Sequence, residues 1–149
     1  MTTGAPPRTG WARLAPELIV DDLTVSRRFW CDLLTFEVAY ARPDFVYLER
    51  AEGAQIMLCG RDAKMETGAL EKPFGRGVLL QVYVDDVATV ARTLADAGWP
   101  LHAPLRDVWR QWGDREGGQR ELWVQDPDGY LIMVAQHIGE RAVAPQEET

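Results

Sequence analysis

The sequence predicts an α+β fold made of two tandem βαβββ modules, and three observations support this. First, a Val-Asp-Asp turn at residues 20–22 recurs 64 residues later at 84–86, each time between an apolar run and a helical pattern. Second, the pattern at residues 52–58 recurs 76 residues later at 128–134. Third, Asp126-Pro127-Asp128-Gly129 separates two apolar-rich runs, which predicts a β-hairpin.

The first module is expected to span residues 11–60. Residues 1–10 are rich in Pro, Gly and Thr and are predicted to form a disordered tail, followed by a strand over 11–20. Asp22 can cap a helix whose apolar face consists of Val25, Phe29 and Leu33, widened by Trp30 and Leu34. Three short runs then predict an antiparallel meander: 36–41, 45–50 and 54–59.

The second module is expected to span residues 77–136, after a polar linker at 61–76. Its helix has apolar residues at positions 87, 90, 91 and 94, and Gly98 stands where a C-terminal cap belongs. The 12 additional residues of this module fall in 105–118, which we interpret as a long binding loop or lid before the closing hairpin. Residues 137–149 are predicted to form a polar tail.

Composition limits the classes of function. The chain of 149 residues is 46% hydrophobic and 26% charged, which is typical of one soluble globular domain. A net charge of −7 argues against binding to nucleic acid or to an anionic membrane. The sequence has no membrane-spanning apolar run and no hydrophobic segment of a signal peptide near its start, so we expect a cytoplasmic protein. Cys31 and Cys59 are predicted to be reduced core thiols.

The order of these motifs resembles the vicinal oxygen chelate superfamily, which includes glyoxalase I, extradiol dioxygenases, fosfomycin-resistance enzymes and bleomycin-resistance proteins. The resemblance rests on the duplicated Val-Asp-Asp turn, on residues 29–36 (FWCDLLTF), and on the 126–130 turn following 118–121 (GQRE). It implies mixed sheets that curl around a shared cavity, with the helices on the outer face. It also implies a homodimer, with the halves either domain-swapped or side by side.

Metal-dependent members of this superfamily place four ligands on strands that face the cavity. Aligned on the repeated turns, these positions carry Ala15, Met57, Leu79 and Met133, none of which suits a hard divalent metal. His102 and His137, the two histidines, lie far apart in the sequence and are expected at the surface. We therefore predict no metal, no cofactor and no catalytic residue.

Strand parity suggests which side chains line a small-molecule pocket. The predicted lining combines apolar groups with amides, a phenol and carboxylates: Glu17, Tyr47, Glu49, Gln55, Met57, Leu79, Gln81, Leu122 and Met133. Glu17 and Glu49 either face the pocket, where they would bind cationic groups, or are solvated at strand ends.

The predicted loop adds aromatic and cationic groups. Trp109 and Trp112, with Arg120 nearby, offer flat surfaces that can stack on an aromatic ligand. Alternatively, both indoles fasten the loop to its own sheet or to a dimer partner.

Together these features predict a non-catalytic binding protein, similar to the bleomycin-resistance branch, that sequesters a planar aromatic or partly cationic antibiotic-like molecule in a homodimer. Two alternatives remain open at this point. One is a metal-dependent lyase, dioxygenase or transferase of the same superfamily, and the other is an accessory protein with a vestigial cavity.

Overall fold

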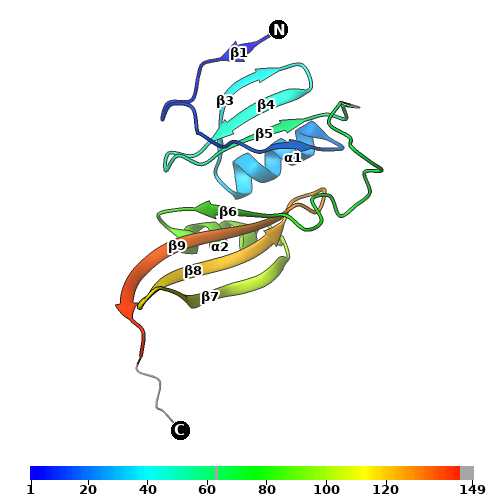
Figure 1. Ribbon diagram of the computed structural model, residues 1–149. Coiled ribbons are helices and arrows are strands. Elements are labelled where there is room, and N and C mark those ends of the chain that lie inside the picture. The colour runs from blue at the N-terminus through cyan, green and yellow to red at the C-terminus, as the bar shows by residue number, and fades with distance from the viewer. Residues whose placement is uncertain (63, 145–149) are drawn as a thin grey trace.

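A computed structural model describes residues 1–62 and 64–144, and it contains two consecutive βαβββ modules (Figure 1). Asp22 caps the first helix, its carboxylate accepting a hydrogen bond from the Val25 N–H at 3.1 Å. The elements of the first module are β2 (Glu17–Ile19), α1 (Leu23–Arg28), a π-helical turn η1 (Phe29–Leu33), β3 (Glu37–Arg42), β4 (Phe45–Glu49) and β5 (Gln55–Cys59).

The second module repeats this order with longer strands. Asp86 caps its helix through the Thr89 N–H at 3.2 Å, and Gly98 ends it at a positive φ of 67°, as the sequence predicted. The elements are β6 (Leu79–Tyr83), α2 (Val87–Asp96), β7 (Leu101–Trp112), β8 (Arg115–Gln125) and β9 (Leu131–Ala142).

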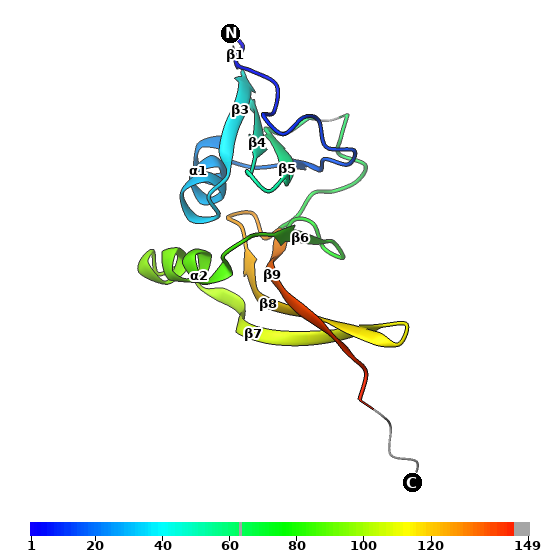
Figure 2. The same cartoon turned by 90° about the vertical axis from the view of Figure 1, so that its left-hand side faces the viewer.

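Each module forms one mixed sheet. The first sheet has the order β1-β3-β4-β5-β2, where β1 (Thr3–Gly4) comes from the N-terminus, and the second has the order β6-β9-β8-β7. The pairs β2–β5 and β6–β9 are parallel, and the other pairs are antiparallel. Figure 2 shows both helices on the same side of the molecule, while the other side of each sheet is not covered by a helix. The α+β fold is thus confirmed, but the sheets do not close around a cavity within the chain.

One continuous hydrophobic core joins the modules. It lies between the helices and the sheets and includes Trp30, Leu48 and Leu58 of the first module with Leu94, Leu122 and Ile132 of the second. The buried stripe of the first helical segment is Ser26, Phe29, Trp30 and Leu34, whereas Val25 is 45% exposed. The π-helical turn at 29–33 affects only the end of this stripe, where Leu34 and not Leu33 is fully buried.

The Asp126-Pro127-Asp128-Gly129 turn joins the modules instead of closing a pocket. Within the turn, Asp126 accepts hydrogen bonds from the N–H groups of Asp128 and Tyr130, each at 2.9 Å. Its other oxygen accepts a bond from the indole of Trp30 in the first module at 3.3 Å. Burial raises the pKa of Asp126 to about 6.

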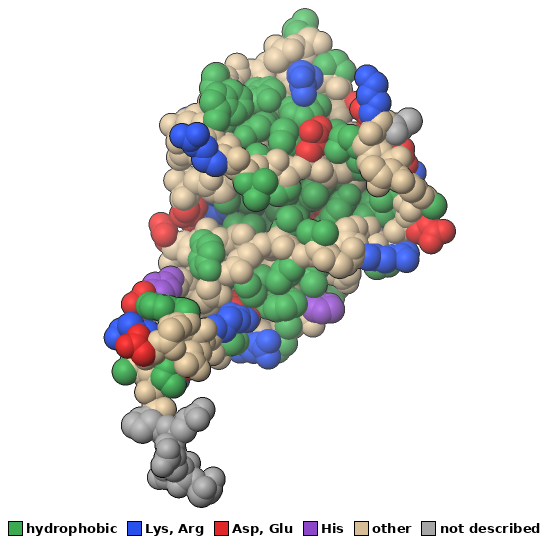
Figure 3. All heavy atoms as spheres, in the orientation of Figure 1, with side chains coloured by type: hydrophobic (Ala, Val, Ile, Leu, Met, Phe, Trp, Pro, Cys, Tyr) green, Lys and Arg blue, Asp and Glu red, His purple; other side chains and the backbone are tan. Residues whose placement is uncertain are grey.

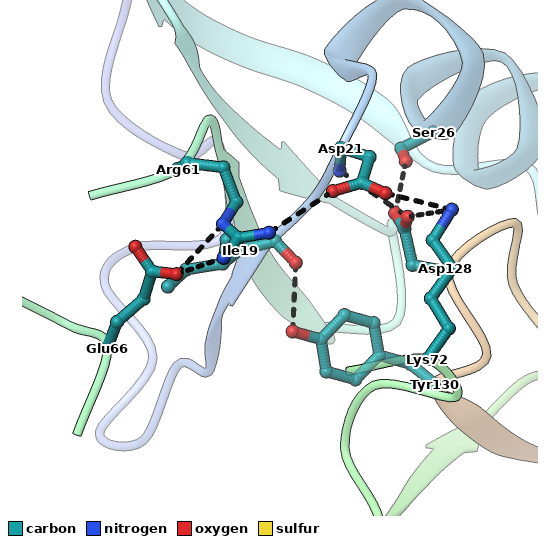
Figure 4. Close-up of polar contacts among 8 residues, drawn as sticks. All are labelled: Ile19, Asp21, Ser26, Arg61, Glu66, Lys72, Asp128 and Tyr130. Carbon is teal, nitrogen blue, oxygen red and sulfur yellow. Dashed lines mark hydrogen bonds and ion pairs between the residues drawn. The ribbon is translucent and has the colours of Figure 1, made fainter. Parts of the chain in front are cut away.

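Asp128 and Tyr130 reach further into the first module (Figure 4). Asp128 accepts hydrogen bonds from the Ser26 hydroxyl at 3.2 Å and from the Asp21 N–H at 3.4 Å. The Tyr130 hydroxyl donates to the carbonyl of Ile19 at 2.8 Å. Lys72 lies beside Asp21 and Asp128, at 2.9 and 3.5 Å. We call the contacts that residues 126–130 make with the first module and with residues 72–74 the joint.

Four segment predictions from the sequence were wrong. Residues 1–10 are ordered, because β1 pairs with β3 and the following residues bind the first sheet. The strand predicted over 11–20 is confined to Glu17–Ile19. The predicted loop at 105–118 is a long hairpin formed by β7 and β8, with its turn at Gly113 and Asp114. β9 continues through residues 137–142 of the predicted polar tail, because it pairs with β8 along that length.

The linker is also more structured than its composition suggested. Phe74 is 2% exposed and belongs to the core, and its N–H donates to the carbonyl of Asp128 at 2.8 Å. No helix in the described part of the chain is long and apolar enough to cross a membrane.

Candidate functional site

The faces of the two sheets that point away from the helices lie next to each other on one side of the molecule, and we call them the first and second open faces. Figure 3 looks onto this side, where hydrophobic side chains gather over the first sheet and along the groove between the modules. This groove has a volume of about 310 Å³. Leu14, Pro16 and Gln55 line it from the first module, and Leu79 and Gln81 line it from the second.

The first open face brings together four of the predicted residues. The register pairs Tyr47 with Met57 and Glu49 with Gln55, so all four side chains share one face. Tyr47, Glu49 and Gln55 are each less than 10% exposed, and the Tyr47 hydroxyl donates to the Gln55 amide oxygen at 2.6 Å. Tyr40 stacks on Tyr47 with ring centroids 5.2 Å apart. Glu49 is therefore not solvated at a strand end, which was the alternative left open.

An N-terminal segment that no sequence pattern predicted to lie here covers this face. Residues 8–12, which we call the arm, run across it. Arg8 forms an ion pair with Glu49 at 2.9 Å, and Trp11 packs edge-on against Tyr47 with ring centroids 5.5 Å apart. Residues 8–10 of the arm belong to the predicted disordered tail, and residues 11–12 belong to the strand predicted over 11–20, so neither prediction placed the arm on this face.

Glu17 lies on the edge strand β2 of the first sheet, where the register pairs it with Met57, so it shares the first open face as strand parity predicted. It is exposed and lines a surface hollow of about 570 Å³ together with Arg42, Asp44 and Arg61. Cys59 also lines the hollow, but burial raises the pKa of its thiol to about 11, so the thiol stays protonated at neutral pH. The structure therefore does not bring Glu17 and Glu49 together as a carboxylate pair.

The second open face combines exposed side chains along β6 with buried side chains on β8 and β9. The register aligns Gln81, Met133 and Trp123 across β6, β9 and β8, and it aligns Tyr83 with Ala135 and Glu121 one step along. Leu79 and Tyr83 are 40% and 49% exposed, and Gln81 is exposed as well. Gln119 connects the polar groups, since its amide lies 2.6 Å from the Tyr83 hydroxyl and 3.4 Å from the Gln81 amide.

A buried carboxylate lies beneath these groups. Glu121 is fully buried and forms a bidentate ion pair with Arg110, both contacts measuring 2.7 Å, while the Trp123 indole donates to it at 3.2 Å. The hydrogen bonds from Arg110 are the main reason why the pKa of Glu121 is lowered. The carboxylate is therefore ionised at neutral pH and fully engaged, which fits a rigid support for the face better than an acid or base.

Three predicted site residues lie on the opposite side of the second sheet. Leu122 is fully buried in the core, and Arg120 forms an ion pair with Asp107 at 2.8 Å. Trp109 lies over Gly118 and is stacked by the Arg141 guanidinium at 3.9 Å. This is the fastening role that was left open for the indoles. The parity prediction for β8 was wrong by one residue, because Trp123 and not Leu122 pairs with Met133.

Trp112 is 51% exposed near the tip of the hairpin, away from the groove residues. The histidines are exposed as expected, and His102 stacks on Trp123 with ring centroids 6.2 Å apart. The residues that sequence reasoning did not place at the two faces are Arg8, Trp11, Glu121 and Trp123.

The positions that hold a metal in related enzymes do not fit one here. Met57 and Met133 project from the centres of two different sheets, and Ala15 and Leu79 lack donor atoms. Across residues 1–62 and 64–144, no three His, Cys, Asp or Glu side chains lie close enough together to hold a metal ion. We derive no chemical step through a metal.

Comparison with known proteins identifies the class. Residues 10–134 match the model of the Glyoxalase/Bleomycin resistance protein/Dioxygenase superfamily, and the chain belongs to this superfamily. A search of curated proteins found no match.

Several solved structures share the fold. A virulence protein from Salmonella typhimurium is 22% identical, with a TM-score of 0.63 over 86% of this chain and 98% of the other. A protein of unknown function from Agrobacterium tumefaciens is 23% identical, with a TM-score of 0.66 over 87% and 96%. TioX from Micromonospora sp. ML1 is 19% identical, with a TM-score of 0.65 over 86% and 100%. At these identities the likeness concerns the fold alone.

Proposed function

We propose that the protein binds and sequesters a small, planar, partly cationic molecule of antibiotic type without transforming it. The observation that carries the proposal is the second open face, where Leu79, Gln81 and Tyr83 are exposed beside the groove. Tyr83 is aligned through Ala135 with the buried Glu121, which pairs with the half-exposed Arg110. An apolar surface with a few oriented polar groups is typical of small-molecule sites. Glu49 and Glu121, which are buried carboxylates of the open faces, are both paired with arginines.

We further propose that the working form is a homodimer. Leu79 and Tyr83 lie beside other exposed apolar side chains, including Leu14 and Val78, along the groove side of the molecule. Covering such side chains with a second copy removes apolar surface from water and encloses the ligand. Sedimentation equilibrium tests this part, and a monomer at 100 μM would contradict it.

The binding proposal is tested by titrating the wild-type chain with planar aromatic antibiotics, bleomycin among them, while recording tryptophan fluorescence. Trp123 and Trp11 lie on the open faces, so a bound ligand is expected to quench their emission. Tyr83→Ala is expected to weaken binding about tenfold, through the loss of a stacking surface. Arg92→Ala, on the exposed side of α2, is the matched control and is expected to bind like the wild type.

The alternative hypothesis, a metal-dependent enzyme, is tested on the same protein preparation. Stoichiometric nickel, zinc, manganese or iron in the purified protein, removed by a chelator together with a measurable activity, would overturn the binding proposal. Absence of quenching and of any rise in melting temperature across the whole panel would also contradict it.

A further inference from the structure

The arm makes contacts of the kind that a ligand would make. It is anchored by β1 and by the Ala5 N–H, which donates to the Ala39 carbonyl at 3.0 Å. The chain then forms a turn at residues 7–10, closed by a hydrogen bond from the Gly10 N–H to the Pro7 carbonyl at 3.0 Å, and continues along the first open face. Three kinds of group on the arm contact three kinds of group on the face. A guanidinium pairs with a carboxylate, backbone amides form hydrogen bonds with a side-chain amide, and an indole packs against two phenol rings.

The charged contact is made to Glu49. The Arg8 backbone N–H donates to one carboxylate oxygen at 2.8 Å, and the Arg8 Nε donates to the other at 2.9 Å. The Glu49 side chain is 4% exposed, whereas that of Arg8 is 66% exposed and also contacts Glu37. The buried member of the pair thus belongs to the sheet, and the exposed member belongs to the arm.

The amide contact is made to Gln55. Its oxygen accepts a hydrogen bond from the Ala12 N–H at 3.0 Å, and its nitrogen donates to the Gly10 carbonyl at 2.5 Å and to the Thr9 hydroxyl at 3.3 Å. If the arm left, Gln55 would lose three partners and keep only the Tyr47 hydroxyl. A buried amide needs replacement partners, which water or a ligand would have to supply.

The aromatic contact is made to the Tyr40–Tyr47 stack. The Trp11 indole lies edge-on to both rings, with centroids 6.2 and 5.5 Å away, yet it remains 58% exposed. An indole that leaves more than half of its surface in water gains only part of the free energy available from burial. The arm therefore supplies hydrogen-bond partners to the buried polar groups of the face, while its own Arg8 and Trp11 side chains stay more than half exposed. The buried groups that make these contacts all belong to the sheet.

We propose that the first open face is a recognition site for molecules that combine a guanidinium or amine, an aromatic ring and an amide, and that the arm is its resident occupant. A ligand of this class must displace the arm to bind. This proposal goes beyond the proposed function, which the second open face carries, because it adds a recognition site on the first open face and an internal competitor for that site.

The test supplies the arm in trans. The probe is a fluorescein-labelled peptide with the sequence of residues 5–13, APPRTGWAR. The receptors are the full-length wild type and the full-length Arg8→Ala, Trp11→Ala double variant, in which the arm has lost its charged and aromatic contacts. Fluorescence anisotropy is expected to show at least tenfold tighter binding to the double variant than to the wild type, in which the intact arm competes.

Controls are placed in the peptide, so that they cannot disturb folding of the receptor. A peptide with Glu in place of the arginine at position 4, and one with Ala in place of the tryptophan, are each expected to bind the double variant at least tenfold more weakly. Equal binding of these peptides and the parent peptide, or no binding of the parent peptide to the double variant, would overturn the proposal. If the double variant does not fold, judged by near-ultraviolet circular dichroism, Arg8→Ala alone replaces it under the same criteria.

The outcomes separate the two proposals. Peptide binding without any small-molecule binding would support the recognition site and contradict the sequestration function. If small molecules bind the wild type and the double variant equally and the peptide does not bind, the result would support the proposed function. It would contradict the proposal that the arm competes with a ligand.

Discussion

The two open faces belong to repeats of one structural unit, yet they satisfy their polar groups in different ways. On the first face, Glu49 and Gln55 depend on partners from the arm, which is distant in sequence and partly exposed. On the second face, Glu121 depends on Arg110, which belongs to the neighbouring strand of the same sheet. The comparison indicates that the first face is adaptable and the second is preformed.

Both faces depend on the joint for their relative position, so the largest effect is expected there. Gly129→Ala is expected to lower the free energy of unfolding by about 3 kcal/mol, because a Cβ would lie 2.4 Å from that of Pro73 at a φ of +93°. Urea denaturation measures this. Gly98→Ala is the control: its φ is +67° with open space around it, and about 1 kcal/mol is expected. Equal losses would contradict a packed joint.

The joint also predicts a pH dependence. Burial raises the pKa of Asp126 from 3.8 to about 6, so the fold favours its protonated form. Its contribution to stability is complete below pH 3.8 and is lost as the pH rises through 6, about 3 kcal/mol in total. Asp126→Asn is expected to remove this component, seen as a changing difference from wild type between pH 4 and 7. A constant difference across this range would show that Asp126 has an ordinary pKa.

The second face should respond to pH in the opposite direction. Arg110 lowers the pKa of Glu121 below its ordinary value of 4.5, so this contribution is present above pH 4.5 and is lost as the pH falls. Because Arg110 is 46% exposed, Glu121→Gln is expected to cost only about 1 kcal/mol at pH 7, measured by urea denaturation. Glu140→Gln, from an exposed pair with Arg115, is the control, and a cost as large as that of Glu121→Gln would argue against a preformed face.

The smallest effect on global stability is expected on the first face. Arg8→Ala should free the arm and increase hydrogen exchange at the Ala12 N–H, which donates to Gln55, while the amides of β8 and β9 remain protected. Exchange resolved by mass spectrometry after proteolysis measures both regions in one experiment. Unchanged exchange in the arm, or a uniform increase over the whole chain, would show that the two faces are not independent.

The fold was predictable because the sequence repeats its turns. Asp22 and Asp86 both cap helices as expected, and the three strands of the first meander lie within a residue or so of their predicted positions. The 105–118 segment was predicted to be a loop because it is polar. Its Gly113-Asp114 dipeptide, which is typical of a two-residue β-hairpin turn, was not used in that prediction.

The candidate site was less predictable, for physical reasons. The face of a strand depends on the register that its turn imposes, and the five residues between β8 and β9 place Glu121 and Trp123 on the open face instead of Leu122. The arm was missed because its contacts join residues more than 40 positions apart, and no local pattern records such contacts. Strand parity within the first meander needed no long-range information, which is why Tyr47, Glu49, Gln55 and Met57 were grouped together.

The Tyr130 hydroxyl has a consequence for biosynthesis. Its acceptor, the Ile19 carbonyl, leaves the ribosome 111 residues earlier, and Ser26 waits 102 residues for Asp128. During synthesis, the Ile19 carbonyl and the Ser26 hydroxyl, at the connection between β2 and α1, therefore lack these hydrogen-bond partners. The partners become available only when nearly nine-tenths of the chain has been translated. Folding of the first module is therefore expected to finish only after the 126–130 turn has been made. Chains that stall before residue 126 are expected to stay sensitive to protease at the connection between β2 and α1.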